Sequence, residues 1–175
     1  MAFNDQVALL YQRQEKTVRR AGVGPGVGGD WSPAANFNIF NIAGGPVRIT
    51  GIWGHVTAVF AGTATPIVSH TPTGGAAANM CVIAVAAAYA LNTFLTWDGS
   101  LTAVSGVLRA SAAVGFTQST DSVGTPATAE SWVGTIVAVP GIIRITNAGV
   151  ADATGMVDWY LSYIPMRDGA TVSPL

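Results

Sequence analysis

The stretch from Phe37 to Phe60 constrains the fold of this chain more than any other. Within it, Val47-Arg48-Ile49-Thr50 alternates apolar and polar side chains. This is the period of a strand that buries one face. The Gly-Gly-Pro sequence at residues 44–46 predicts a turn immediately before the strand. We therefore expect a β-protein that is built around a long strand beginning at residue 47.

This long strand is expected to bend at Gly51. Strict alternation from Val47 would place Ile52, Val56 and Phe60 on the polar face, together with Arg48. A shift of one residue at Gly51 returns these side chains to the apolar face. A glycine inside a strand pattern is typical of a β-bulge, which makes such a shift.

The composition suits a protein whose surface is covered by neighbours. Of the 175 residues, 50% are hydrophobic and only 10% are charged, against about 25% charged in an average soluble domain. The formal net charge is −1, so no overall field attracts nucleic acid or an anionic membrane. The length fits one domain, or one domain with an arm, and is enough to form a core without disulfides or metals.

Short apolar segments separated by turn residues continue to the C-terminus. We predict strands at 31–42, 67–69, 81–85, 94–97, 101–108, 132–139, 142–146 and 155–165. Asp98-Gly99 is expected to form the hairpin turn between 94–97 and 101–108. Ile143-Arg144-Ile145-Thr146 echoes residues 47–50, which suggests paired or symmetry-related strands. The pattern predicts an all-β fold, a jelly-roll-like antiparallel β-sandwich over residues 31–175.

Residues 1–30 differ from the rest and are interpreted as an arm. Apolar side chains fall near helical spacing, basic residues follow them, and residues 21–30 form a glycine-rich linker. A short amphipathic helix needs a partner surface, because an isolated one is marginal in water. The arm either docks on its own domain or reaches a neighbour; the alternative is a frayed terminus. The candidate contact residues are Phe3, Val7, Leu10, Tyr11, Arg13, Arg19 and Arg20.

The sequence contains no recognisable catalytic or metal-binding pattern. His55 and His70 have no clustered His, Cys, Asp or Glu companions, as a metal site requires. Cys81 lies in an apolar run that is typical of a buried, inert thiol. No G-x-S-x-G elbow occurs, and the glycines at 22–29 neither follow a strand nor open a helix, as a phosphate loop would. We therefore expect no enzymatic activity, cofactor, metal or small-molecule substrate.

The aromatic residues suggest core positions and one interface. Trp53, Trp97, Trp132 and Trp159 lie in predicted strands and are expected in the core. Tyr160 and Tyr163 are the candidates for a protein interface, because tyrosine suits contact surfaces. The basic residues of the arm are too few to predict a nucleic-acid site. No secretory signal is visible at the N-terminus, and the longest apolar run, residues 80–91, is too short to span a bilayer.

Two stretches resemble structural proteins of tailed-bacteriophage virions. The first is GGPVRITGIWGHVT at residues 44–57, which resembles a GGPV strand opening. The second is DWYLSYIPMRDGATV at residues 158–172, which resembles a W-x-L-x-Y-x-P-x-x-D-G-A ending. The resemblance implies a β-sandwich that coats or cements a capsid, commonly as a trimer. It carries no catalytic motif and therefore implies no site residues.

The resemblance leads to one main expectation and two alternatives. The main expectation is a capsid decoration (cement) protein on the virion, which binds the major capsid protein and other copies of itself, with the arm reaching a neighbouring subunit. The first alternative is a tail or fibre module that binds a receptor glycan through exposed Trp or Tyr. The second is a small hydrolase, for which the sequence shows no constellation of residues.

Overall fold

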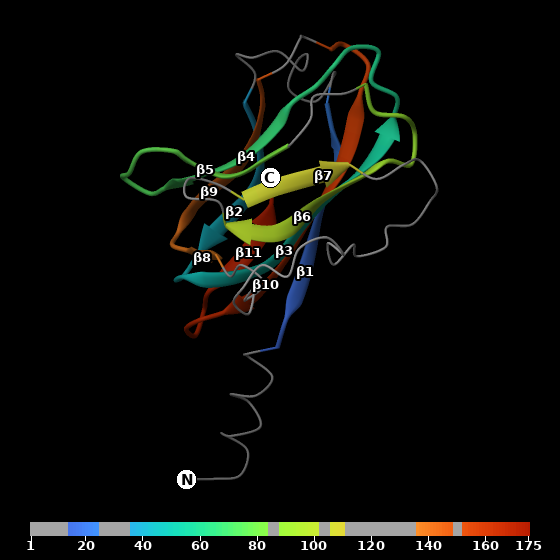
Figure 1. Ribbon diagram of the computed structural model, residues 1–175. Coiled ribbons are helices and arrows are strands. Elements are labelled where there is room, and N and C mark those ends of the chain that lie inside the picture. The colour runs from blue at the N-terminus through green and yellow to red at the C-terminus, as the bar shows by residue number, and fades with distance from the viewer. Residues whose placement is uncertain (1–13, 25–35, 84–87, 102–105, 111–135, 149–151) are drawn as a thin grey trace, which may run out of the picture.

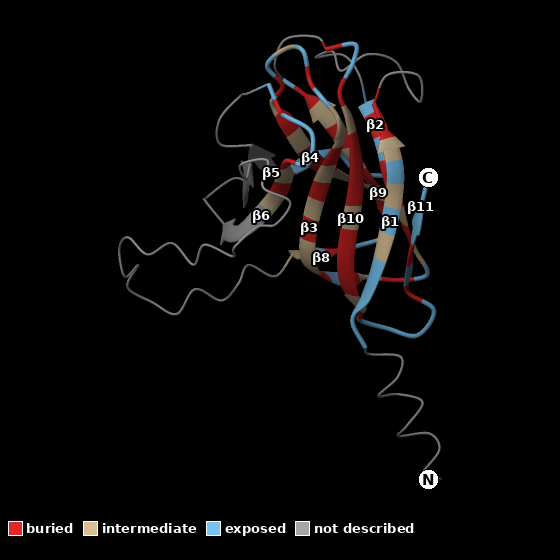
Figure 2. Cartoon of the chain, turned by 90° about the vertical axis from the view of Figure 1, so that its right-hand side faces the viewer, coloured by how far each residue is buried: buried red, intermediate tan, exposed pale blue. Residues whose placement is uncertain are grey.

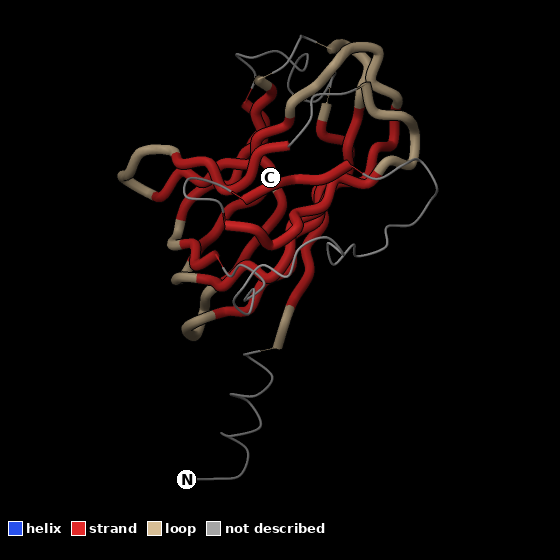
Figure 3. The backbone as a smooth tube through the Cα atoms, in the orientation of Figure 1, coloured by secondary structure: helices blue, strands red, loops and turns tan. Residues whose placement is uncertain are grey.

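The computed structural model describes residues 14–24, 36–83, 88–101, 106–110, 136–148 and 152–175. All regular structure in these ranges is strand, and no helix occurs in them (Figure 3). The strands are β1 (Lys16–Val23), β2 (Asn36–Ala43), β3 (Val47–Ala58), β4 (Pro66–Pro72), β5 (Ala78–Ile83), β6 (Phe94–Leu101), β7 (Gly106–Ala110), β8 (Ile136–Ala138), β9 (Gly141–Asn147), β10 (Met156–Pro165) and β11 (Thr171–Pro174). The all-β expectation is confirmed.

The strands form two antiparallel sheets that pack as a sandwich (Figure 1). The first sheet runs β1-β10-β3, and β3 then pairs with both β8 and β6. The second sheet runs β5-β4-β9-β2-β11. β7 joins the two sheets, since it pairs antiparallel with β6 and parallel with β5. At the other side, β1 lies near β11 without a ladder between them, so the sandwich is open there.

β3 is the long, bent strand that the sequence predicts. Val47 and Ile49 are fully buried, and after Thr50 and Gly51 the buried positions resume at Ile52. The register against β10 shifts at the same place, because Ser162 is opposite Gly51 and Tyr163 is opposite Ile49. Thr50 is therefore the extra residue of a β-bulge, and the predicted change of phase at Gly51 is confirmed.

The core lies between the two sheets. β10 contributes much of it, with Val157, Trp159 and Leu161 at 0% exposure, and Figure 2 shows this strand buried over most of its length. β2 adds a run of large apolar side chains from the opposite sheet, including Ile39 and Phe40. Both residues are buried, although they are consecutive, because the register between β2 and β9 shifts between Asn38 and Phe40. This local bulge allows both side chains to face the core.

The two echoing tetrapeptides lie in facing sheets. Residues 47–50 begin β3, which has strands on both sides in the first sheet, and residues 143–146 lie in β9, between β2 and β4 of the second sheet. Ile49 and Ile145 are both fully buried. The two segments are therefore interior strands of the sandwich and are not paired with each other.

The predicted arm is wrong over part of its length. Lys16–Val23 is the edge strand β1, paired with β10. Residues 16–20, which include Arg19 and Arg20, are therefore not helical, and residues 21–23 are not part of a linker. Val18 and Arg20 are less exposed than their neighbours, so the burial follows the period of a strand. Hydrogen bonding to an available edge of β10 decides the structure here, and the helical spacing of the apolar residues does not. The interpretations of residues 1–13 and of the linker at 25–30 lie outside the described residues.

The predicted hairpin turn at Asp98-Gly99 is also wrong. β6 continues through both residues to Leu101, and its register against β7 shifts between Trp97 and Leu101. Asp98 and Gly99 therefore lie within an irregular part of β6. The antiparallel pairing of the flanking segments, β6 with β7, is as expected.

Candidate functional site

The outer face of the first sheet carries a group of interacting polar and aromatic side chains. Alternation along β10 directs Asp158 and Tyr160 away from the core side chains Val157 and Trp159. The register places Tyr160 beside Arg19 of β1 and Trp53 of β3, and places Asp158 beside His55 of β3. We call the following residues the outer cluster: Arg19, Trp53, His55, Phe94, Asp158 and Tyr160.

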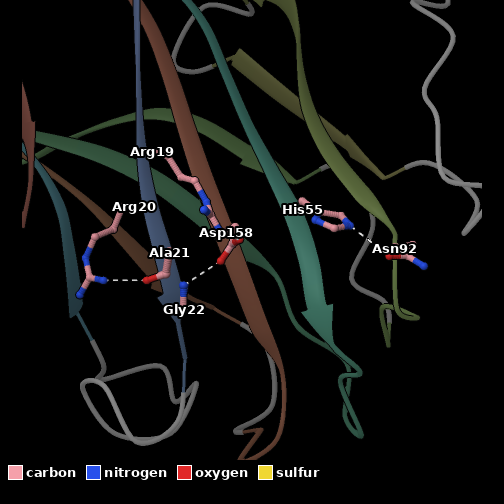
Figure 4. Close-up of polar contacts among 7 residues, drawn as sticks. All are labelled: Arg19, Arg20, Ala21, Gly22, His55, Asn92 and Asp158. Atoms are coloured by element: carbon pink, nitrogen blue, oxygen red, sulfur yellow. Dashed lines mark hydrogen bonds and ion pairs between the residues drawn. The ribbon is translucent and has the colours of Figure 1, made fainter.

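Asp158 is the polar centre of the outer cluster. Its Oδ2 lies 2.5 Å from Arg19 Nη2, and its Oδ1 accepts a hydrogen bond of 2.8 Å from the backbone N–H of Gly22. Figure 4 shows both β1 groups converging on the carboxylate. Its side chain is 9% exposed, whereas that of Arg19 is 56% exposed. Burial acts to raise the pKa of Asp158, but the hydrogen bonds from Arg19 and Gly22 and the nearby positive charge outweigh it, so the pKa is lowered.

The aromatic side chains of the outer cluster stack on each other. Trp53 and Tyr160 have centroids 5.3 Å apart and planes within 2°, and Arg19 Cζ lies 5.9 Å from the Tyr160 centroid. Arg19 and Trp53 belong to the strands on either side of β10, so Tyr160 has a neighbour on each side. Trp53 is half-buried on this outer face, and its predicted core position is wrong.

His55 contacts two side chains on the side of β3 that faces β6. Its ring stacks on Phe94 with centroids 4.9 Å apart, and Nε2 lies 3.1 Å from Asn92 Oδ1 (Figure 4). Asn92 adopts a left-handed conformation, with φ of 64°. The described hydrogen bond of His55 is thus to an amide and not to a hydroxyl or thiol that it would activate. The contacts of the outer cluster link β1, β10, β3 and β6.

A second buried carboxylate holds a turn. Asp152 is 3% exposed and accepts hydrogen bonds from the backbone N–H groups of Gly62, Thr154 and Gly155. Burial acts to raise the pKa of Asp152, but these hydrogen bonds outweigh it and lower the pKa. The carboxylate oxygens of Asp152 thus accept hydrogen bonds from groups within the protein. Among the described residues, no three His, Cys, Asp or Glu side chains gather as a metal site would require.

The other predicted residues are dispersed. His70 is half-buried, and its Nε2 donates a 3.0 Å hydrogen bond to the carbonyl oxygen of Val139. Burial lowers the pKa of His70, although that hydrogen bond acts in the opposite direction.

Tyr163 is only 3% exposed and packs in the core, so its predicted place in an interface is wrong. It lies on the same face of β10 as Trp159. Arg20 bonds the neighbouring carbonyl of Ala21.

Residues 1–13 contain five of the predicted contact residues. Phe3, Val7, Leu10, Tyr11 and Arg13 all lie outside the described residues. Conversely, sequence reasoning missed Asp158 as a site residue. Alternation with Val157 and Trp159 places it on the outer face, but its partner Arg19 is 139 positions away and was assigned to a helix.

The outer face of the second sheet carries uncharged polar side chains, with the partly exposed Ile67 and Ile142 among them. Asn36 of β2 pairs in register with Thr146 of β9, and Asn41 of β2 lies beside Ser173 of β11. In a third cross-strand pair, Asn38 of β2 lies opposite Arg144 of β9. We call this surface the amide face, defined by Asn36, Asn38, Asn41, Thr146 and Ser173. Arg144 is the charged side chain in these pairs.

The two stretches that carry the phage resemblance lie side by side. β10 pairs with β3 from Pro165 opposite Val47 to Met156 opposite Ala58. The turns also touch, because the N–H of Met166 donates a 3.1 Å hydrogen bond to the carbonyl oxygen of Pro46. A Cβ at Gly44 would lie 1.9 Å from the carbonyl oxygen of Gly169. The glycines of both motifs thus permit a close contact between two turns.

No protein-family model, no curated protein and no solved structure matches this chain. Within the described ranges, no helix is long and apolar enough to cross a membrane.

Proposed function

We propose that this chain is a structural protein of a tailed-bacteriophage virion, and specifically a capsid decoration protein that binds the major capsid protein. The observation that carries the proposal is the meeting of the two resembling stretches. They are separated by a hundred positions in the sequence, yet they form the paired strands β3 and β10 and a shared contact between turns. The resemblance therefore concerns one structural unit.

The chemistry of the surface supports the same proposal. In the outer cluster the ionised Asp158 is paired with Arg19, and the described hydrogen bond of His55 is to an amide. This arrangement supports a structural role over a catalytic one. The amide face offers hydrogen-bonding groups with little charge to desolvate, and burying charge is the expensive part of forming an interface. We propose that the amide face contacts the major capsid protein.

Capsid binding by variants of the amide face tests this proposal. Asn38→Lys with Asn41→Lys places two ammonium groups in the proposed interface, and we expect the apparent affinity for capsids to fall about tenfold or more. The measurement is co-sedimentation with capsids of the phage that encodes the chain. A matched control, Thr17→Lys, adds a charge to an exposed position on the other sheet and should bind as the unmodified chain does. Equal binding by all the variants would exclude the amide face, and no binding by the unmodified chain would contradict the decoration role.

The tail or fibre alternative gains no specific support from the described residues. Its glycan-binding form requires an open aromatic face, and Tyr160 has a neighbour on each side. The trimeric state remains a proposal that rests on the resemblance alone, and light scattering coupled to size exclusion measures it directly.

A further inference from the structure

Three large apolar side chains are exposed at one end of the first sheet. Val137 is 54% exposed, Met166 is 53% exposed and Val139 is 48% exposed. Scattered single apolar residues are normal on a surface, but contiguous ones mark a site of interaction. Their positions in the sheet therefore matter.

The register makes these side chains neighbours. Ile164 of β10 and Val137 of β8 lie on either side of Arg48 in β3. One step further along, Met166 is hydrogen-bonded to Pro46, and Val139 follows Ala138, which pairs with Val47. The residues alternate with the buried Val47 and Ala138 and so face outward. We call this surface the end patch: Pro46, Val137, Val139, Ile164 and Met166, which lie around the exposed side chain of Arg48.

The N-terminal segment enters the described structure beside the end patch. Lys16 pairs with Tyr163, and the side chain of Glu15 is hydrogen-bonded to the Thr50 hydroxyl on the outer face. The chain before Gln14 thus starts about one strand spacing, ~4.8 Å, from the end of β10. Thirteen residues precede Gln14, and the sequence of residues 3–11 contains five large apolar side chains: Phe3, Val7, Leu9, Leu10 and Tyr11.

We propose that residues 3–11 of the same chain fold back and cover the end patch. Nine residues in a helix span about 13 Å, and the patch extends across two strand spacings, about 10 Å, from β10 to β8. The lengths therefore match. The connection from Tyr11 to Glu15 is short, so the effective concentration of the segment at its own patch is high and favours it over the segment of another copy. The proposal does not depend on the capsid role.

Cross-linking tests which surface the segment covers. In a Cys81→Ser background, Leu10→Cys is combined with Val137→Cys, and the matched control combines Leu10→Cys with Asn38→Cys on the exposed amide face. We expect disulfide formation to Val137→Cys to be about tenfold faster or more than in the control. Equal rates would overturn the proposal. In mixtures of isotopically light and heavy chains, the cross-linked peptides should be light–light or heavy–heavy; a statistical share of light–heavy peptides would show that a neighbouring copy supplies the segment and would also overturn it.

A second measurement does not depend on introduced cysteines. Leu10→Asp should release the segment and expose the end patch, which raises the fluorescence of a hydrophobic dye about twofold or more. Gln12→Asp, which adds the same charge on the opposite side of a helix, should leave the fluorescence unchanged. A dye signal that is the same in both variants and in the unmodified chain would contradict the proposal, provided that the unfolding transition is unaltered.

Discussion

At Gly44 the backbone has φ of 73°, and a methyl group there would overlap the carbonyl oxygen of Gly169. This single position explains why a glycine-rich turn precedes the longest strand, since two turns from distant parts of the chain meet across it. The sequence predicted the turn from its composition. It did not predict the contact, because the identity of the opposing turn depends on the pairing of β3 with β10.

Substitution of Gly44 tests the contact between the turns. Gly44→Ala combines a strained φ with a steric overlap, and we expect it to lower the free energy of unfolding by about 3 kcal/mol or more. Gly74→Ala is the matched control, because Gly74 has φ of 76° and open space around it. The control should lose only about 1 kcal/mol. Denaturant unfolding measures both values, and equal losses would contradict the close approach of the turns.

The pKa of Asp158 gives a prediction about pH. Because the folded state lowers this pKa, the contribution of Asp158 to stability is fully present above the unfolded pKa of about 3.9 and is lost as pH falls through the folded value. Asp158→Asn should therefore cost about 1–3 kcal/mol at pH 7, and the difference from the unmodified chain should shrink below pH 4. Asp168→Asn, in an exposed turn, should change stability little at pH 7. A difference for Asp158→Asn that stays constant from pH 7 to pH 3 would contradict the role of the ionised carboxylate.

At the scale of the elements, alternation predicted strands well where a buried face enforces it. β3, β9 and β10 each bury one face in the core, so their sequences show the period of two, and the bulge in β3 was visible as a change of phase. β1 was misassigned because it is an edge strand with little buried surface, so its sequence is free to show other spacings. The prediction of a turn at Asp98-Gly99 was wrong because β6 continues past this strong local turn signal. The outer cluster could not be predicted, since its partners come from four strands.

The bulge in β3 makes a prediction about deletions. Removing Thr50, the extra residue, leaves Ile49 and Ile52 on the same face of a regular strand, so the variant should fold with a loss of about 1–3 kcal/mol. Removing His55 from the same strand reverses the faces of the residues on one side of the deletion, as a one-residue slip does. That variant should not fold cooperatively. Thermal unfolding followed by circular dichroism compares them, and similar behaviour of the two deletions would contradict the assigned bulge.

At the scale of the molecule, the fold is a sandwich with one open side between β1 and β11 and with two chemically different outer faces. One face contains an ion pair and stacked rings, and the other presents amides and hydroxyls beside Ile142 and Arg144. The proposed function uses this difference, because it attaches the protein by one side. The fold class followed from the sequence, whereas the proposed attachment surface required the register of β2, β9 and β11, which no local pattern contains.

Imaging of whole virions by electron cryo-microscopy tests the central claim most directly. Under the proposed function the particles are those of the phage that encodes the chain, and particles from a deletion of its gene serve as the control. The account predicts sandwich-shaped density on the outer surface of the capsid, in contact with the major capsid protein and missing from the control. Density confined to the tail, or no difference between the two kinds of particle, would contradict it.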